Sequence, residues 1–320
     1  MDNTRHARSG YALANPDEEP ANLNLILYDQ TGNYTASSNL TLAAHGHLAE
    51  FAYQRFSEAG DGFEGILQFA SDRPLHAVAL RYDNEAQDVF STIPVIAEER
   101  AAPLYFPQIV DGAGYRTNFI LLNPRDFSLS VRLEFFAPDG TPLSLPINGA
   151  WRTSLDFFLE PRSSVSCFTD AEETAIRAGW AKAASSVPIE GAAVIQRIQG
   201  PAIFSEAGMV PVSPAERFLS YIDSKGSADS GVAICNPNSE AVRLNLRLRN
   251  PEGEIVAVTS RVLSRRGQLS GFFTEWFPFG FREFEGTLDV SSLAPVAAVA
   301  LRFDNPLLDV FAALPVVVIR

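Results

Sequence analysis

The sequence predicts an all-β protein made of three tandem Ig-like antiparallel β-sandwich domains. Three observations support this fold class. Four ordered motifs recur three times along the 320 residues, which is the signature of an internal repeat. Apolar and polar residues alternate with a period of two in the longest patterned segments, and turn residues interrupt these segments about every 8–12 residues. The chain is 46% hydrophobic, which is enough to fill packed cores.

The repeat defines the expected domains. Its first marker is an Asn-Pro pair after an apolar stretch, its second an alternating strand, and its third a glycine that opens another strand; the fourth is a hairpin-like pair that closes on a proline. The asparagines are Asn15, Asn123 and Asn236, the glycines Gly65, Gly179 and Gly286, and the prolines Pro94, Pro211 and Pro315. The spacing from asparagine to proline is 79, 88 and 79 residues. We therefore expect domains at 1–96, 97–212 and 213–320.

Each repeat has the pattern of short strands. In the segment 242–249, VRLNLRLR, four apolar residues alternate with polar ones, as in a strand with one buried face. Asp139-Gly140 and Glu252-Gly253 are typical of hairpin turns, because glycine adopts the positive φ that such turns require. One short helix is expected before each glycine strand, in FAYQRF, FTDAEETAI and FFTEWF. Thr169 and Glu172 form a capping-box pattern in the second of these.

Two asymmetries between the repeats bear on assembly. The net charge is −8 in the first repeat, from 13 acidic and five basic side chains, −4 in the second and −1 in the third. The first repeat also has its first strand missing, which leaves a sheet edge open to another chain. Residues expected to take part in head-to-tail assembly are the apolar tail and the arginines of one strand face: Val316, Val317, Val318, Ile319, Arg243, Arg247 and Arg249. The alternatives are a truncated or processed N-terminus and an ordinary open edge.

The motifs also resemble a known kind of module. The middle repeat, with FPQIVDGAGYRTNFILLNP followed by VRLEFFAPDGTPL, is similar to modules of uncharacterised secreted or surface proteins of bacteria, acidobacteria especially. The outer repeats, with GVAICNP, EGTLDV and ALRFDN, are similar to a sister form of this module. This resemblance implies an extracellular or cell-surface protein of repeated β-sandwiches with no established activity. The chain itself shows no leader, so we expect either a removed leader or a cytosolic protein.

The candidate reactive residues are few. His45 and His47 form a possible metal-binding pair, but in the repeat alignment they fall on Arg266 and Gln268, which indicates a turn that tolerates several polar residues. Glu98 and Glu99 are a second, weak candidate for Ca²⁺. Neither is expected to bind a metal, no cofactor is expected, and we predict that the protein is not an enzyme.

Tryptophans and cysteines are the remaining candidates. Trp151 lies in a glycine-rich turn and is the best candidate for a sugar-binding platform; Trp180 is expected in the core and Trp276 to be partly exposed. Cys167 and Cys235 fall in different repeats, and we expect buried, reduced thiols, with a disulfide between repeats as the alternative.

These observations exclude some partners and favour others. A net charge of −13 opposes binding to nucleic acid or to an anionic membrane surface. No apolar run is long enough for membrane insertion. We expect a non-enzymatic structural or adhesive protein whose partner is a second copy, another surface protein or a glycan, and which in one hypothesis builds a filament. The alternative is a carbohydrate-binding surface protein.

Overall fold

The computed structural model describes residues 1–4, 7–83, 89–93, 95, 103–200, 202–277, 283–304 and 309–319. Within these residues the chain is all-β, since antiparallel strands alternate with turns and the helices are single turns. The described helices are too short to cross a bilayer.

The first repeat contains two four-stranded sheets. One has the order β1-β6-β3-β4 and the other the order β5-β2-β7-β8. The elements are β1 (Asp2–Asn3), β2 (Arg8–Ala14), β3 (Ala21–Asp29), β4 (Tyr34–Leu42), β5 (His47–Phe51), α1 (Ala52–Arg55), the 3₁₀ turn η1 (Ser57–Ala59), β6 (Phe63–Ser71), β7 (His76–Asp83) and β8 (Val89–Ile93).

The second repeat also has two four-stranded sheets, and each has the strand order of one sheet of the first repeat: β9-β16-β11-β14 and β15-β10-β17-β18. It adds a hairpin of β12 and β13. Its strands are β9 (Leu104–Asp111), β10 (Tyr115–Leu122), β11 (Leu129–Phe136), β12 (Leu145–Ile147), β13 (Ala150–Arg152), β14 (Ser154–Leu159), β15 (Ser164–Phe168), β16 (Arg177–Ala184), β17 (Glu190–Gln199) and β18 (Ala202–Met209).

In the third repeat one long strand, β24 (Glu285–Asp304), takes part in both sheets, in the places that β16 and β17 fill in the second repeat. The sheets have the orders β22-β21-β24-β19-β26 and β23-β20-β24-β25. The other elements are β19 (Ala215–Asp223), β20 (Ala228–Cys235), β21 (Val242–Arg249), β22 (Ile255–Leu263), β23 (Gln268–Phe272), α2 (Phe273–Trp276), β25 (Phe311–Leu314) and β26 (Val316–Val318).

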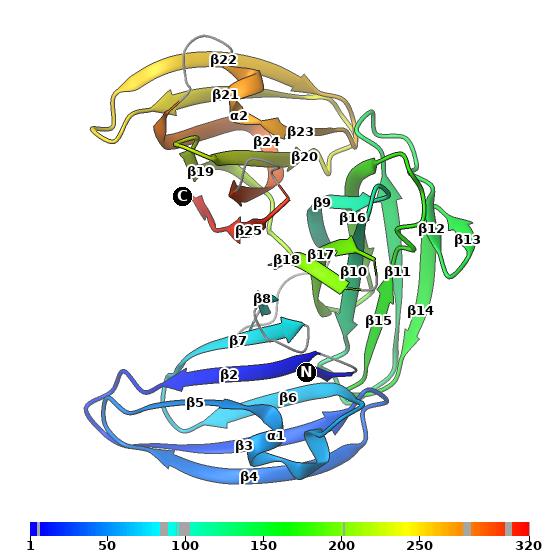
Figure 1. Ribbon diagram of the computed structural model, residues 1–320, viewed down its shortest axis with the longest axis vertical. Helices are drawn as coiled ribbons and strands as arrows, with labels where there is room; N and C mark the ends of the chain where they lie inside the picture. The colour runs from blue at the N-terminus through cyan, green and yellow to red at the C-terminus, as the bar shows by residue number, and fades with distance from the viewer. Residues whose placement is uncertain are drawn as a thin grey trace.

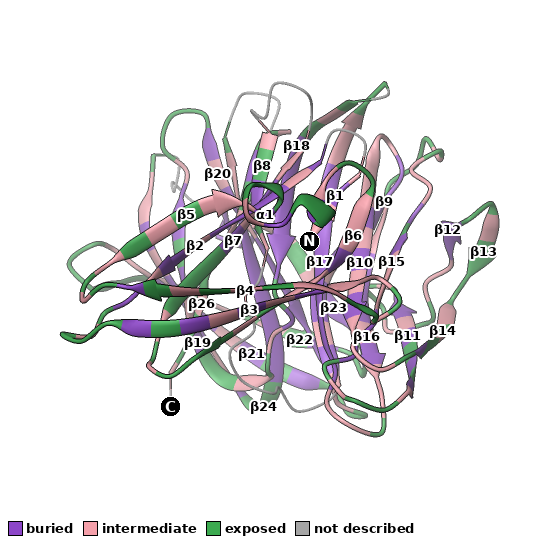
Figure 2. Cartoon of the chain, turned by 90° about the horizontal axis from the view of Figure 1, so that it is seen from below, coloured by how far each residue is buried: buried purple, intermediate pink, exposed green. Residues whose placement is uncertain are grey.

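The three repeats lie around a common centre in the shape of a C (Figure 1). β8, β18 and β25, the counterparts of one another, lie toward this centre, and β18 contacts both of the others. Apolar side chains from both sheets of each repeat form its core, and many buried residues lie in the strands (Figure 2). The core of the second repeat continues into the third through Ala233, Val299, Leu301 and Phe311.

The recurring asparagine holds the same loop in every repeat. The side-chain amide of Asn123 donates to the carbonyl oxygens of Phe127 at 2.8 Å and Glu160 at 2.8 Å, and its own oxygen accepts from the backbone of Arg125. Asn15 and Asn236 make the corresponding bonds in their repeats. All three are buried, so the motif satisfies carbonyls that would otherwise lack a partner.

The recurring glycine is required by a close approach of two strands. A Cβ at Gly65, Gly179 or Gly286 would lie 2.0–2.1 Å from a carbonyl oxygen of the neighbouring strand. No side chain fits in that space, so these glycines are conserved between the repeats for packing and not for flexibility.

Alternation in the segment 242–249 is confirmed, because its four apolar side chains are buried in β21. Four of the sheets have four strands each, and this arrangement is also similar to a propeller with four blades. The assignment of three Ig-like sandwiches therefore stays a prediction. The helix expected in the second repeat is wrong. Thr169 is buried and exchanges hydrogen bonds with Thr117 of β10, so its hydroxyl is not available as a helix cap, and the segment after it is irregular.

The edge strands differ from what the sequence suggested. The first strand of the first repeat is present as a remnant, because β1 pairs with β6 at Asp2 and Asn3. The C-terminal strand β26 pairs with β19 of its own repeat, Phe218 opposite Val318. The apolar, β-branched tail therefore forms an edge strand of the third repeat's own sheet in this structure. One edge of the tail strand is already paired with β19.

Candidate binding pocket between the first two repeats

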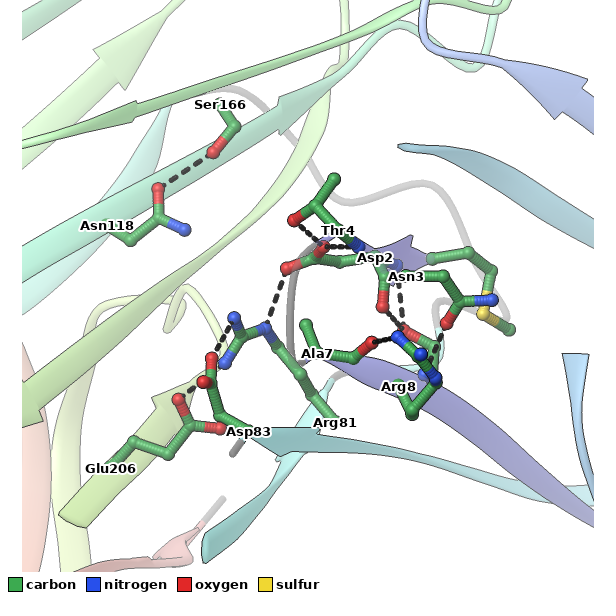
Figure 3. A network of polar contacts seen from close by, with 12 residues as sticks. Asp2, Asn3, Thr4, Ala7, Arg8, Arg81, Asp83, Asn118, Ser166 and Glu206 are labelled. Carbon is green, nitrogen blue, oxygen red and sulfur yellow. Dashed lines mark hydrogen bonds and ion pairs between the residues drawn. The ribbon is translucent and has the colours of Figure 1, made fainter. Parts of the chain in front are cut away.

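The main candidate for a functional site is a pocket of about 440 Å³ where the β6 side of the first repeat faces β10, β15 and β17 of the second. Its floor is apolar, with Ile66, Ile120 and Leu122, and its polar side chains include Glu64, Asn118, Ser166 and Glu190. Ser166 donates to the Oδ1 atom of Asn118 at 2.9 Å, on the side opposite Asp2 and Arg81 (Figure 3).

The pocket exists because the contact between the first and second repeats is less filled than the contact between the second and third. Trp180 follows the recurring Gly179, is buried, stacks on Phe136 and donates its indole N–H to the carbonyl of Arg266 at 2.7 Å. Ile66 holds the corresponding place after Gly65. The smaller side chain leaves space that the indole fills at the other contact.

A buried ion-pair cluster lies beside this pocket, and two of its members, Asp2 and Arg81, belong to the lining. Arg81 of β7 contacts Asp2 at 2.9 Å, Asp83, and Glu206 of β18 in the second repeat at 2.6 Å (Figure 3). Glu206 is fully used, since Ser91 donates to its Oε1 atom and Gln196 to its Oε2 atom. The cluster therefore joins the first two repeats through charge-assisted bonds shielded from water.

The pKa of Arg81 reflects this environment. Burial alone would lower it, but the carboxylates of Glu206, Asp2 and Asp83 outweigh burial, so the pKa is raised and the guanidinium stays charged. Burial likewise opposes ionisation of Asp2, but Arg81 and the hydrogen bonds from Thr4 hold the pKa of Asp2 below its usual value.

Of the carboxylates that line the pocket, Asp2 is not free for acid–base chemistry. Both oxygens of Asp2 are occupied, one by Arg81 and the other by the backbone and hydroxyl of Thr4. Glu64 differs, because burial and the neighbouring Asp2 raise its pKa. Carboxylate-pair catalysis requires two groups free to act on a substrate. The arrangement instead suits binding of a small polar ligand, for which Glu64, Asn118 and Ser166 offer hydrogen bonds above an apolar floor.

Arg81 belongs to a recurring position. Arg302 is its counterpart in the third repeat and contacts Asp223 and Asp304, while Arg197 in the second repeat donates to the carbonyl of Ala113. The sequence shows this arginine in ALRYDN, VIQRIQ and ALRFDN. That recurrence was the available signal for the cluster, which we did not predict from the sequence.

The repeats are joined by one contact used twice, which we call the hairpin-on-turn contact. A hairpin of one repeat (29–33 or 137–141) packs on a turn of the next (160–164 or 264–268). The N–H of Ser164 donates to the carbonyl of Gln30 at 3.0 Å, and the N–H of Gln268 donates to that of Pro138 at 2.9 Å.

Glycine is essential on the hairpin side of this contact. Gly32 and Gly140 have φ near +90°, and a Cβ on either would lie 2.0–2.1 Å from a carbonyl oxygen of the facing turn. The turn side supplies a cation. Arg162 lies over the ring of Tyr28 at 5.5 Å, and Arg266 lies over Phe136 at 5.6 Å.

A second cavity, of about 430 Å³, lies where all three repeats meet. Its lining is apolar and includes Ile93 of the first repeat, Met209 and Val210 of the second, and Val299 and Leu314 of the third. It lies next to the central strands and has no charged side chain in its described lining.

The structure separates the site residues that the sequence grouped for assembly. Val316, Val317 and Val318 are in β26, and Ile319 donates its N–H to the carbonyl of Arg217. Arg243, Arg247 and Arg249 share one face of β21, where Arg249 is paired with Asp289 at 3.0 Å and Arg247 donates to Ser291. Arg249 and Arg247 are therefore already bonded to side chains of the neighbouring strand in their own sheet.

The structure shows how far each of the three tryptophans is exposed. Trp151 is 49% exposed on the β12–β13 hairpin, which projects from the molecule, and Arg177 lies over its ring at 4.6 Å (Figure 2). Trp180 is buried, as predicted. Trp276 is buried too, so its predicted exposure is wrong; α2 turns its side chain into the core of the third repeat.

The remaining candidates are the two histidines, the two glutamates and the two cysteines. His45 lies in a turn with φ 54° and contacts Glu18 at 3.0 Å, whereas His47 begins β5, so the two do not share a strand face. No group of three or more metal-ligating side chains occurs among the residues described. Glu98 and Glu99 lie outside them. Cys167 and Cys235 are buried free thiols, as predicted.

Comparison with known proteins adds little. No family model matches the sequence, and no curated protein matches it. Among solved structures, the native conformation of E. coli alpha-2-macroglobulin, determined by cryo-EM, is 13% identical with a TM-score of 0.13. The alignment covers 93% of this chain but 19% of that chain, so this chain spans about a fifth of its length. The likeness supports neither a fold nor a function.

Proposed function

We propose that this chain is a non-enzymatic structural or adhesive protein of the cell surface or extracellular space, built from three Ig-like β-sandwich modules fixed as one rigid body. The observation that carries the proposal is the use of its recurring residues. The recurring asparagines and glycines contact backbone, the recurring arginines make ion pairs or hydrogen bonds that hold the fold, and the buried cluster around Arg81 joins two repeats. The polar groups shared by the modules thus maintain shape.

Three further features support a rigid body over loosely linked modules. The core of the second repeat includes side chains of the third. Arg81 and Glu206 link the first repeat to the second below the surface. The hairpin-on-turn contact fixes the hairpins of the first and second repeats against the repeat that follows each of them. Interfaces of this kind, partly apolar and with buried charge pairs, restrict relative domain motion.

Electron microscopy of the purified chain in negative stain tests this proposal. A rigid structural body gives class averages with one C-shaped arrangement of three lobes. Three beads at variable angles would overturn it. The location is tested separately, by fractionating cells of the source organism and probing each fraction with an antibody.

The second candidate function is carbohydrate binding, and two observations favour it. Trp151 exposes half its surface on a projecting hairpin, and the pocket beside Glu64 combines carboxylate, amide and hydroxyl groups with an apolar floor. Sugars present both hydroxyl groups and apolar C–H faces, which these two surfaces match.

A glycan array distinguishes the two surfaces. Loss of signal in Trp151→Ala alone assigns binding to the hairpin, and loss in Asn118→Ala alone assigns it to the pocket. Phe158→Ala, which removes another exposed aromatic ring of the second repeat, is the matched control. No signal with the unmodified chain refutes the carbohydrate hypothesis.

A further inference from the structure

The hairpin-on-turn contact leaves one hairpin and one turn without a partner repeat among the described residues. The third repeat carries the same hairpin at 250–254, with the same backbone bonds from Asn250 to Glu254 and from Gly253 to Asn250. Here a Cβ at Gly253, with φ +85°, would meet nothing within 4 Å. A carbonyl oxygen of the facing turn excludes a side chain from Gly32 and from Gly140, but no atom does so at Gly253, although the hairpin is the same.

The first repeat carries the unused turn, at 43–47. His45 has φ 54°, against 57° for Arg162 and 54° for Arg266. The turn is closed by the same bond, from Gly46 to the carbonyl of Ala43, and braced by the same kind of bond, from His45 to the carbonyl of Asp17. His47 is exposed, whereas its counterpart Gln268 is buried in the contact.

We propose that the 250–254 hairpin of one copy docks on the 43–47 turn of a second copy, so that chains associate head to tail. This proposal rests on the structural function proposed above and names its partner, a second copy of this chain. The N–H of His47 takes the place of the Ser164 and Gln268 N–H groups and donates to the carbonyl of Pro251.

The side chains at the two unused surfaces are complementary. At each internal contact an aromatic ring on the hairpin strand, Tyr28 or Phe136, meets a cation on the turn. At the unused surfaces the hairpin strand carries Arg249 and the turn carries the ring of His45. The cation and the ring have exchanged sides, so between copies the planar guanidinium of Arg249 can stack on the imidazole of His45.

Arg249 is already placed for this role. It is the counterpart of Tyr28 and Phe136, since its carbonyl is the one that excludes a Cβ from Gly286. Asp289, which is buried, holds its guanidinium at 3.0 Å, and Arg249 also donates to the carbonyl of Gly253 in the hairpin. The side chain is therefore ordered beside the docking surface before a partner arrives, which lowers the entropic cost of binding.

Charge favours the same pairing. The docking turn belongs to the repeat with net charge −8, and Asp17, Glu18 and Glu19 lie in the loop that braces it. The hairpin belongs to the repeat with net charge −1, and Arg243, Arg247 and Arg249 line the strand that leads into it. Attraction between this acidic loop and the arginines steers association and weakens at high salt, and the acidic side chains of Glu252 and Glu254 in the hairpin itself reduce it. The contact joins two different surfaces, so it is heterologous and produces open chains or closed rings.

A side chain at Gly253 tests the proposal. Gly253→Asn preserves the hairpin, because asparagine tolerates positive φ and the space around Gly253 is open within the monomer. Between copies, its Cβ would meet the carbonyl of Ala44, as a Cβ at Gly140 would meet that of Arg265. The matched control is Gly62→Asn, at φ +87° with nothing within 4 Å and outside both docking surfaces.

The measurement is sedimentation velocity of the full chain over a range of concentrations and salt. We expect the mass of the unmodified chain and of Gly62→Asn to rise above 34.9 kDa with concentration and to fall with salt, and Gly253→Asn to remain at 34.9 kDa. Added in small amounts, Gly253→Asn shortens assemblies of the unmodified chain, because its intact turn binds a chain end that it cannot extend. Equal assembly by Gly253→Asn, or a constant mass for the unmodified chain, overturns the proposal.

Microscopy of the same samples separates this proposal from the structural function on which it rests. Single C-shaped particles without assembly refute the docking and preserve the rigid structural body. Flexible beads refute the structural function itself.

Discussion

Replacing Arg81 with methionine should be the most destabilising single change at the contact between the first two repeats. Methionine preserves much of the side-chain length but removes the charge that Glu206, Asp2 and Asp83 share. The side chain of Glu206 is fully buried, so its carboxylate would be left without its charge partner. Breaking a buried pair in this way costs about 3–5 kcal/mol of unfolding free energy.

Arg302→Met is the matched control, because Arg302 is the counterpart of Arg81 in the third repeat. Its side chain is 34% exposed, and its partners Asp304 and Asp223 are 48% and 11% exposed. Water reaches Arg302 and Asp304, so this variant should lose less than Arg81→Met, about 1 kcal/mol. Any difference between the two variants reports the burial of the Arg81 cluster.

Urea unfolding followed by tryptophan fluorescence measures both variants. With a slope of about 2–3 kcal/mol per molar urea, Arg81→Met should lower the midpoint by about 1–2 M. Adding Glu206→Gln to Arg81→Met should restore part of the loss. Equal midpoints for Arg81→Met and Arg302→Met would refute the reasoning.

Three other predictions follow from the recurring motifs and the thiols. Asn123→Ala removes the donor to buried carbonyls and should cost about 2–3 kcal/mol in urea unfolding. Gly179→Ala should destabilise the chain in thermal unfolding, because its Cβ would lie 2.1 Å from a carbonyl oxygen, whereas Gly10→Ala, where the nearest atom is at 3.4 Å, should change the midpoint little. Burial raises the pKa of Cys167 to about 12 and also raises that of Cys235, so neither thiol should react with iodoacetamide at pH 8 until the chain unfolds; rapid native labelling would contradict their burial.

The local structure was largely predictable from the sequence. The alternation in 242–249, the glycine turns and the Asn-Pro motif each depend on contacts within one repeat, where sequence spacing determines which groups meet. The same logic failed at Thr169, because a capping-box pattern is a local signal and the hydrogen bonds to Thr117, 52 residues away, are stronger competitors. The same reasoning also failed at Trp276. The residue at the aligned position of the first repeat is polar, but this does not determine how Trp276 packs in the third repeat.

The candidate site was not predictable, because it depends on how whole repeats are placed against each other. The pocket arises from the difference between Ile66 and Trp180, and this has meaning only once both positions are known to face a neighbouring repeat. Arg81 and Glu206 are 125 residues apart and follow no common motif. The repeated arginine marked one half of the cluster, but no sequence pattern marked its partner.

The continuous strand β24 has a mechanical consequence. In the first two repeats a short loop, 72–75 or 185–189, separates the two strands that are merged in the third. In the third repeat the backbone from Glu285 to Asp304 runs through both sheets without a break. No loop can bend there to change the angle between the sheets, so the third repeat should be the stiffest of the three.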